Sequence, residues 1–242
     1  MGRIRLDKLL SNAGYGSRKE IKQFLRDGLV TVDGTFVSRP ETKVDTDMQT
    51  VLFNGEAVLA ETPQYIVMNK PAGVISATYD EQEETVIDLL GDDVDSWTLF
   101  PVGRLDKDTV GLLLLTNDGA FAHRALSPKR HVAKTYRALV TGTLTEDDVK
   151  TFEKGVLLED GYTCKTAVLR ILSADDTSEA EVVITEGKYH QVKRMFAACG
   201  KTVTYLQRIA FGGLALDSSL AEGEYRPLTA EELVLVQARE TE

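Results

Sequence analysis

The segment from Gly103 to Gly111 has the residue types and spacing of a loop that could carry out chemistry. Its sequence, Gly-Arg-Leu-Asp-Lys-Asp-Thr-Val-Gly, combines charge with glycine and runs directly into the apolar run Leu112 to Leu115. A loop that enters a buried strand holds its side chains rigidly at the edge of a sheet. Asp106 could therefore be a nucleophile or a general base. The competing interpretation is that Asp106 or Asp108 accepts backbone N–H bonds and caps a turn.

Several other catalytic sites are excluded by the motifs that define them. The sequence contains no Gly-x-x-x-x-Gly-Lys-Ser/Thr phosphate loop, no Gly-x-Gly-x-x-Gly, no His-Glu-x-x-His and no Gly-x-Ser-x-Gly. Its two cysteines, Cys164 and Cys199, and its three histidines are scattered. This scatter gives little support for a metal centre or a Cys/His nucleophile. We therefore expect neither a metal nor a cofactor.

The composition is that of an ordinary globular protein of one large or two modest domains. The chain has 242 residues, of which 43% are hydrophobic and 27% charged. Its apolar runs, such as Leu112 to Leu115, are far shorter than the roughly 20 residues of a membrane-spanning helix. The N-terminus carries Arg3 and Arg5 and no apolar signal segment. We therefore expect a cytoplasmic protein without a membrane partner.

Charge is distributed unevenly along the chain. The net charge of −10 by itself argues against a nucleic-acid partner. However, residues 1–43 carry a net charge of +4, and residues 119–145 and 187–216 contain no acid and carry +5 each, which leaves −24 on the rest. The three histidines, His123, His131 and His190, also lie in the acid-free segments. We interpret these three segments as the binding surface for a nucleic acid.

The N-terminal segment has the pattern of a small α/β unit. Apolar residues at helical spacing predict a helix from Leu6 to Ala13, and Ser17 with Glu20 forms a capping box that opens a second helix. Val30 to Val32 predicts a strand that turns at Asp33-Gly34. Basic residues spaced four apart share one stripe of the second helix: Arg18, Lys22 and Arg26. A solvated face is the alternative, but further cations nearby favour a nucleic-acid surface.

The rest of the chain predicts more strands than helices. A polar stretch over residues 54–64 is a plausible linker. Strands are predicted over residues 65–68, 112–115, 136–140, 168–172 and 180–185, and helices over 190–199 and 229–238. Because strands and helices do not alternate regularly, we expect an α+β protein. Residues 1–60 would form the small N-terminal domain and residues 61–242 a catalytic domain with a mixed, largely antiparallel sheet.

The motifs resemble those of a known family. Gly103-Arg104-Leu105-Asp106, then Thr109 and Gly111, then an aliphatic strand ending in Thr-Asn-Asp-Gly, resembles the catalytic signature of RNA pseudouridine synthases of the RsuA/RluA type. Three further segments match in family order: residues 69–73, 134–136 and 186–196. Residues 5–34 resemble an S4 RNA-binding domain. The resemblance covers nearly the whole chain.

The resemblance implies a role for each of several residues. Asp106 would be the catalytic carboxylate, and Tyr136 would pack against the target base. Tyr136 could equally be an aromatic residue of the core. A basic residue would hold the carboxylate ionised, and motif alignment assigns this role to Lys193 rather than Arg194. Arg104 would contact the phosphate of the flipped nucleotide or fill its vacated space, with a surface ion pair as the alternative.

A larger set of residues would bind RNA around this site. The set consists of Arg3, Arg5, Lys8, Arg18, Lys19, Lys22, Arg26, Lys70, Arg130, Lys134, His190 and Arg194. The first seven belong to the S4-like segment. The remaining five lie in or beside the motifs of the catalytic domain.

The implied reaction is the isomerisation of uridine to pseudouridine, in which uracil is detached, rotated and rejoined through carbon after the base is flipped out. Residues 189–198 and 223–229 are similar to the small-subunit branch of the family, which implies uridine 516 of 16S rRNA. The partner would be 16S rRNA or a small-subunit assembly intermediate, bound by a monomer. The alternatives are a 23S rRNA uridine and a non-catalytic S4-type assembly factor. Asp106 could attack C1′, attack C6 or abstract a sugar proton.

Overall fold

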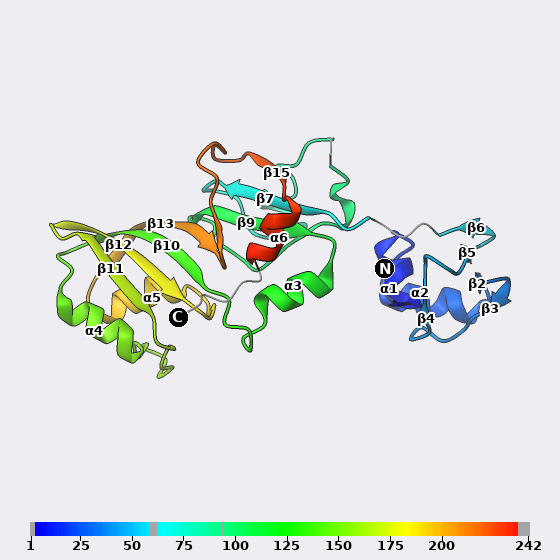
Figure 1. Cartoon of the computed structure of the whole chain (residues 1–242), viewed down its shortest axis with the longest axis horizontal. Helices are drawn as coiled ribbons and strands as arrows, with labels where there is room; N and C mark the ends of the chain where they lie inside the picture. Colours follow the sequence, from blue (N-terminus) through cyan, green and yellow to red (C-terminus); the bar gives the residue numbers. More distant parts are fainter. Residues whose placement is uncertain (1–2, 59–61, 93, 237–242) are drawn as a thin grey trace. The chain divides into compact units, whose positions relative to one another are not determined.

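The computed structural model describes residues 3–58, 62–92 and 94–236 (Figure 1). The chain divides into two compact units, Met1–Pro63 and Gln64–Glu242. Each unit encloses its own buried hydrophobic residues. The predicted domain boundary, between residues 60 and 61, lies outside the described residues.

The first unit packs two helices against short strands. The helices are α1 (Leu6–Asn12) and α2 (Arg18–Arg26). Strand β1 (Ile4–Arg5) pairs with β4 (Lys43–Val44), and a second sheet has the order β3 (Thr35–Phe36), β2 (Val30–Val32), β5 (Val51–Phe53), β6 (Glu56–Ala57). The predicted capping box of α2 is confirmed, because Ser17 N donates to Glu20 Oε2 at 2.8 Å and Glu20 N to Ser17 Oγ at 3.4 Å.

The linker predicted over residues 54–64 is wrong at its start. Asn54 and Gly55, with φ of 49° and 86°, form the turn of a hairpin between β5 and β6. The two strands pair Leu52 with Ala57 and Phe53 with Glu56. An Asn-Gly pair is a strong hairpin signal, because both residues tolerate positive φ. The polar composition of the stretch concealed this signal.

The second unit is built on a nine-stranded sheet. Its main path runs in the order β11 (Val168–Ser173), β12 (Thr177–Ile184), β10 (Lys134–Thr141), β13 (Thr202–Phe211), β9 (Val110–Thr116), β7 (Tyr65–Lys70), β15 (Tyr225–Pro227). Off this path, β14 (Leu214–Ala215) pairs with β13, and β8 (Phe100–Pro101) pairs with β9. Between the strands of the described residues, only β13 and β9 pair in parallel. The predicted α+β class with a largely antiparallel sheet is confirmed.

Helices cover both faces of strand β9, which follows the loop that bears Asp106. Leu113 and Leu115 of β9 belong to the cluster of α4 (Glu146–Lys154) and α5 (Gln191–Ala198), whereas Leu112 and Leu114 belong to the cluster of α3 (Gly119–Leu126) and α6 (Ala230–Val236). In Figure 1, α5 lies against β10 and β12, and α3 and α6 lie by β9 and β7. Burial on both faces explains why β9 is a continuous apolar run. A short 3₁₀ helix, Ser96–Thr98, precedes β8.

All five predicted strands of this unit are present, as is the helix predicted over residues 190–199. The C-terminal helix begins as predicted, with Thr229 N donating to Glu232 Oε2 at 2.9 Å, and residues 237 and 238 lie outside the described part. Two helices, α3 and α4, and the ten-residue strand β13 are not predicted by the sequence patterns. No helix within the described ranges is long and apolar enough to cross a membrane.

The parallel contact between β9 and β13 depends on a residue without a side chain. Gly111 lies opposite Arg208 and has φ of +101°. A Cβ atom there would be 2.4 Å from Arg208 O and 2.9 Å from Arg208 N. Only glycine therefore allows β9 to approach β13 this closely, directly after the loop that bears Asp106.

Candidate active site

Asp106 lies in the turn between β8 and β9, and its backbone is held on both sides. Ser76 Oγ donates to Leu105 O at 2.9 Å and accepts from Leu105 N at 3.0 Å. Asp106 O accepts from Thr109 N at 3.0 Å, which closes the turn. Leu105 is buried in the core, while the Asp106 side chain is 27% exposed. The carboxylate is thus presented at the surface from a fixed backbone.

Lys193 pairs with two carboxylates of this loop. Its Nζ is 3.1 Å from Asp106 Oδ2 and 2.5 Å from Asp108 Oδ1. Burial lowers the pKa of Lys193, but the hydrogen bonds to Asp108 and Asp106 outweigh burial and raise it. The hydrogen bond from Lys193 also lowers the pKa of Asp108. The result is a fixed ammonium group beside Asp106, supplied by the first turn of α5.

His190 approaches the same carboxylate from the residue before α5. Its Nε2 is 3.5 Å from Asp106 Oδ1. Its backbone is left-handed, with φ of 49° and ψ of 33°. The sequence pattern predicts His190 among the RNA contacts, and the structure places it in contact with Asp106.

Lys70 holds the loop from the interior. Its side chain is 0% exposed, and its Nζ donates to the carbonyls of Pro71 at 2.9 Å, Thr109 at 3.0 Å and Lys107 at 3.4 Å. Burial lowers the pKa of Lys70 to about 8, although Asp108 and Asp106 oppose this effect. A buried ammonium must be fully hydrogen-bonded to be tolerated, so its three acceptors fix the loop on either side of Asp108.

Two of the cations predicted to contact RNA are buried in the structure, Lys70 and Lys134. Lys70 is an interior residue whose ammonium is bonded to backbone carbonyls, as described above. Lys134 is 8% exposed, and its Nζ donates to Val132 O at 2.9 Å. Burial and the nearby Arg208 lower the pKa of Lys134 to about 8. Arg208 is also buried, with Nε donating to Leu112 O at 2.7 Å, so part of the charge of the acid-free segments is internal.

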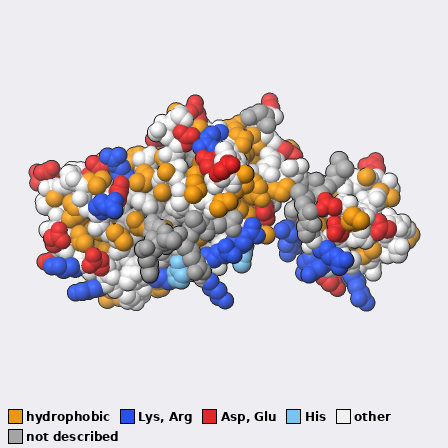
Figure 2. Space-filling model, in the orientation of Figure 1, with side chains coloured by type: hydrophobic (Ala, Val, Ile, Leu, Met, Phe, Trp, Pro, Cys, Tyr) orange, Lys and Arg blue, Asp and Glu red, His pale blue; other side chains and the backbone are white. Residues whose placement is uncertain are grey.

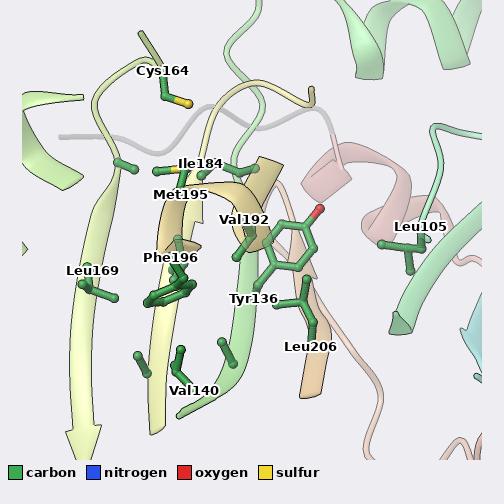
Figure 3. Packing of buried hydrophobic residues seen from close by; sticks show 14 of the residues in the cluster. Leu105, Tyr136, Val140, Cys164, Leu169, Ile184, Val192, Met195, Phe196 and Leu206 are labelled. Carbon is green, nitrogen blue, oxygen red and sulfur yellow. The ribbon is translucent and has the colours of Figure 1, made fainter. Parts of the chain in front are cut away.

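Tyr136 lies in strand β10 and is 8% exposed, within the cluster that also contains Leu105 and Val192. In Figure 3 its ring projects beside Val192 and Leu206, with the hydroxyl end on the side of Leu105. Arg104 is exposed and forms no ion pair with any residue in the described ranges. The alternative of a surface ion pair for Arg104 is thus not observed.

Arg194 is directed away from Asp106. Its Nη2 is 2.5 Å from Asp160 Oδ2, and its Nη1 donates to Tyr189 O at 3.4 Å. Of the two candidate partners for Asp106, the structure places Lys193 beside the carboxylate. Arg130 is exposed, in the turn before β10.

The predicted RNA-binding cations of the first unit differ in their exposure to solvent and in their ion-pair partners. Six of them are exposed: Arg3, Arg5, Arg18, Lys19, Lys22 and Arg26. Lys8 is half-buried, and Arg5 is engaged with the buried Asp7 through bonds of 3.0 Å and 2.7 Å. A hollow in this unit is lined by residues of α2 and its cap: Ser17, Lys19, Glu20, Lys22, Gln23 and Arg26. Figure 2 shows basic side chains gathered on one face of this unit.

Sequence reasoning missed the acid that anchors α5. Glu186 is 9% exposed and accepts from Tyr162 Oη at 2.7 Å, Gln191 Nε2 at 2.7 Å and Lys165 N at 2.9 Å. Burial raises the pKa of Glu186, but these bonds outweigh burial and lower it. Its position at the start of the motif over residues 186–196 was the available signal. By fixing Gln191, Glu186 orients the helix that carries Lys193.

The described part of the chain contains no group of three or more His, Cys, Asp or Glu residues placed to hold a metal ion.

Comparisons with known proteins agree with this arrangement. Residues 64–198 match the family described as RNA pseudouridylate synthase, and residues 4–49 match the S4 domain. The chain is 49% identical over 234 residues to an uncharacterized RNA pseudouridine synthase, YtzG, of Bacillus subtilis, covering 96% of this chain and 98% of that protein. It is 39% identical to the ribosomal small subunit pseudouridine synthase A of Escherichia coli, covering 96% and 100%.

A solved structure extends the similarity to three dimensions. A crystal structure of a pseudouridylate synthase superimposes with a TM-score of 0.70 at 36% identity, covering 96% of this chain and 99% of that one.

The buried amine of Lys70 predicts a pH-dependent stability. Between the folded pKa of about 8 and the ordinary value of 10.5, the unfolded chain binds more protons at this site, so rising pH favours the folded wild type. The free energy of unfolding of the wild type minus that of Lys70→Met should therefore increase from pH 8 to pH 10, by at most about 3 kcal/mol. Urea unfolding at several pH values measures it. A difference independent of pH would contradict the lowered pKa of Lys70.

Proposed function

The chain belongs to the RNA pseudouridine synthase family, and from that premise we propose that it isomerises one uridine of 16S rRNA, uridine 516, with Asp106 as its catalytic carboxylate. The enzyme class, an isomerase acting on RNA, follows from the family. The target is supported by the 39% identity to a ribosomal small subunit pseudouridine synthase. The catalytic role is supported by one observation above all, the pairing of Asp106 with Lys193 at 3.1 Å in a rigid loop.

The reaction needs a carboxylate beside the sugar and a pocket that retains the base. The N1–C1′ bond breaks, uracil rotates, and a C5–C1′ bond forms, while the proton lost from C5 is balanced by one gained at N1. Asp106 would serve this exchange by attacking C1′, by attacking C6 or by removing a sugar proton. In each route the ammonium of Lys193, 3.1 Å from Asp106 Oδ2, would orient the carboxylate until it reacts.

Two further residues complete the proposed site. Tyr136 would pack its ring against the uracil, which is supported by its place beside Leu105 in the cluster next to the loop. Because Tyr136 is only 8% exposed, a base would contact the open edge of the ring unless neighbouring residues move. Arg104, exposed and without an ion pair in the described part of the chain, would contact the phosphate of the flipped nucleotide or occupy the space that the base leaves.

The S4 domain would dock the RNA through the exposed cations of α2. We propose that the partner is 16S rRNA or an assembly intermediate of the small subunit, that the protein acts in the cytoplasm as a monomer, and that no cofactor takes part. The exposed Arg18, Lys22 and Arg26 support the docking role, because they form one stripe of the helix.

Replacing the proposed catalytic carboxylate should abolish the reaction. Asp106→Asn keeps the size of the side chain but removes the charge, so pseudouridine formation should fall at least about a thousandfold, while RNA affinity changes only a few-fold. Isomerisation of a synthetic rRNA fragment, measured by carbodiimide labelling and primer extension, reports the first quantity. Filter binding reports the second.

Asp108→Asn is the matched control. It removes an exposed carboxylate that also pairs with Lys193, and because exposed ion pairs contribute about 1 kcal/mol or less, activity should fall less than about tenfold. An active Asp106→Asn protein would contradict the catalytic role of Asp106, and a wild type without activity would instead support the non-catalytic S4-type factor.

The proposed target predicts one missing modification in a deletion strain. Carbodiimide labelling and primer extension of its ribosomal RNA should lose the stop at uridine 516 of 16S rRNA and keep the other stops. Restoring the gene should restore the stop, whereas the Asp106→Asn gene should not. Loss of a 23S rRNA stop instead would assign the same chemistry to the large subunit.

Lys193 and Arg194 should differ in their effect on the chemical step. Charge-assisted hydrogen bonds contribute about 1.5–3 kcal/mol, so Lys193→Met should lower kcat by about 10- to 100-fold. Arg194→Met removes a cation that pairs with Asp160, and its kcat should remain within about threefold. Single-turnover rates at saturating enzyme compare the two. Equal losses of kcat would argue against the pairing of Lys193 with Asp106.

A further inference from the structure

A stacked pair of aromatic rings lies exposed beside the proposed catalytic carboxylate. The rings of Tyr189 and His190 are 3.8 Å apart between centroids, with 18° between their planes. Tyr189 is 77% exposed, so its ring face turned away from His190 is open to solvent. We propose that Tyr189, backed by His190, is a stacking platform for an unpaired base that flanks the target uridine. This inference rests on the proposed function, because it names a contact of the same substrate.

The location of the pair indicates that it would receive a base next to the target uridine. His190 Nε2 is 3.5 Å from Asp106 Oδ1, so the inner ring of the pair borders the position of the reacting nucleotide. The ring of Tyr189 stacks on the ring of His190 and is the outer ring of the pair. A strand of RNA that places its target uridine at Asp106 therefore brings a neighbouring nucleotide onto Tyr189. Splayed bases that stack on aromatic side chains are a common mode of RNA recognition.

The backbone holds this pair in an unusual conformation. His190 has φ of 49°, a left-handed conformation that is strained for a residue with a Cβ atom and persists only where neighbours enforce it. The neighbours are present: Gln191 Oε1 accepts from Lys188 N at 2.9 Å, and Arg194 N donates to His190 O at 2.9 Å. Gln191 is in turn fixed by Glu186, at 2.7 Å. The structure thus stabilises a strained turn that presents Tyr189 to solvent.

Charge around the pair favours RNA over a protein partner. Lys188 precedes Tyr189 and is exposed, with its Nζ 4.6 Å from the centre of the Tyr162 ring. Arg194 donates to Tyr189 O at 3.4 Å while its Nη2 is paired with Asp160, and no acid occurs in residues 187–216, which leaves Lys188 as the cation beside the ring. An aromatic ring beside a cation is a combination with which proteins hold a single strand, through a stacked base and its phosphate.

The test measures the RNA affinity of the full-length protein while both Tyr189 and the flanking nucleotides are varied. All proteins carry Asp106→Asn, so that affinity is measured apart from chemistry. The probe is a 16S rRNA fragment containing uridine 516, intact or with an abasic nucleotide at one position on either side of that uridine. On intact RNA, Tyr189→Ala should weaken binding about 10- to 100-fold, the loss expected for one stacked base. Tyr189→Phe keeps the ring and should bind within about threefold, and it also controls for folding.

The platform predicts that one abasic position removes the effect of the substitution. With that RNA, the proteins with and without Tyr189→Ala should bind alike, while an abasic site ten nucleotides away should leave the full difference. Equal binding of both proteins to intact RNA, an equal loss for the Phe and Ala substitutions, or a difference that no flanking abasic site removes would each overturn the proposal. A wild type that binds this fragment with the expected coupling but forms no pseudouridine would contradict the proposed function alone.

Discussion

The ion pairs of Lys193 connect two elements that the sequence keeps far apart. Lys193 and Asp108 are separated by 85 residues, yet their atoms are 2.5 Å apart, and Asp106 shares the same ammonium. This contact requires α5 to lie over the sheet beside the start of β9. The hydrogen bonds of Glu186 to Gln191 orient the helix, and the close approach at Gly111 sets β9 against β13. The surrounding helix and strands therefore hold Lys193 and the two carboxylates in fixed positions.

The sequence predicted the parts of the structure that local chemistry determines. The capping box at Ser17, the Thr229 start of α6 and the buried strand after Asp106 all follow from patterns of a few residues, and all are present. The placement of Asp106 next to Lys193 was inferred from the family resemblance and from the basic stripe of one helix. Periodicity alone contains no information on which loop that stripe would meet.

The errors arose where tertiary burial overrides the usual behaviour of a residue. Lysines are rarely buried, so Lys70 and Lys134 were predicted at the surface. Their acceptors are backbone carbonyls, which no side-chain pattern reveals. The same limitation affects charge counting: with Lys134 and Arg208 inside, the acid-free segments present less positive surface than their +5 totals indicate. Strand β13 was not predicted, because polar and charged residues interrupt its apolar positions.

The complete burial of Lys70 affects the reactivity of its amine. An amine with a pKa of about 8 is largely unprotonated at mildly alkaline pH, and is then far more nucleophilic than an ordinary lysine. Because no part of the side chain is exposed, an acylating reagent can reach it only when the loop around Asp106 opens. The rate at which Lys70 is acylated in the native protein therefore reports how often the loop around Asp106 opens, and no substitution has to be introduced to measure it.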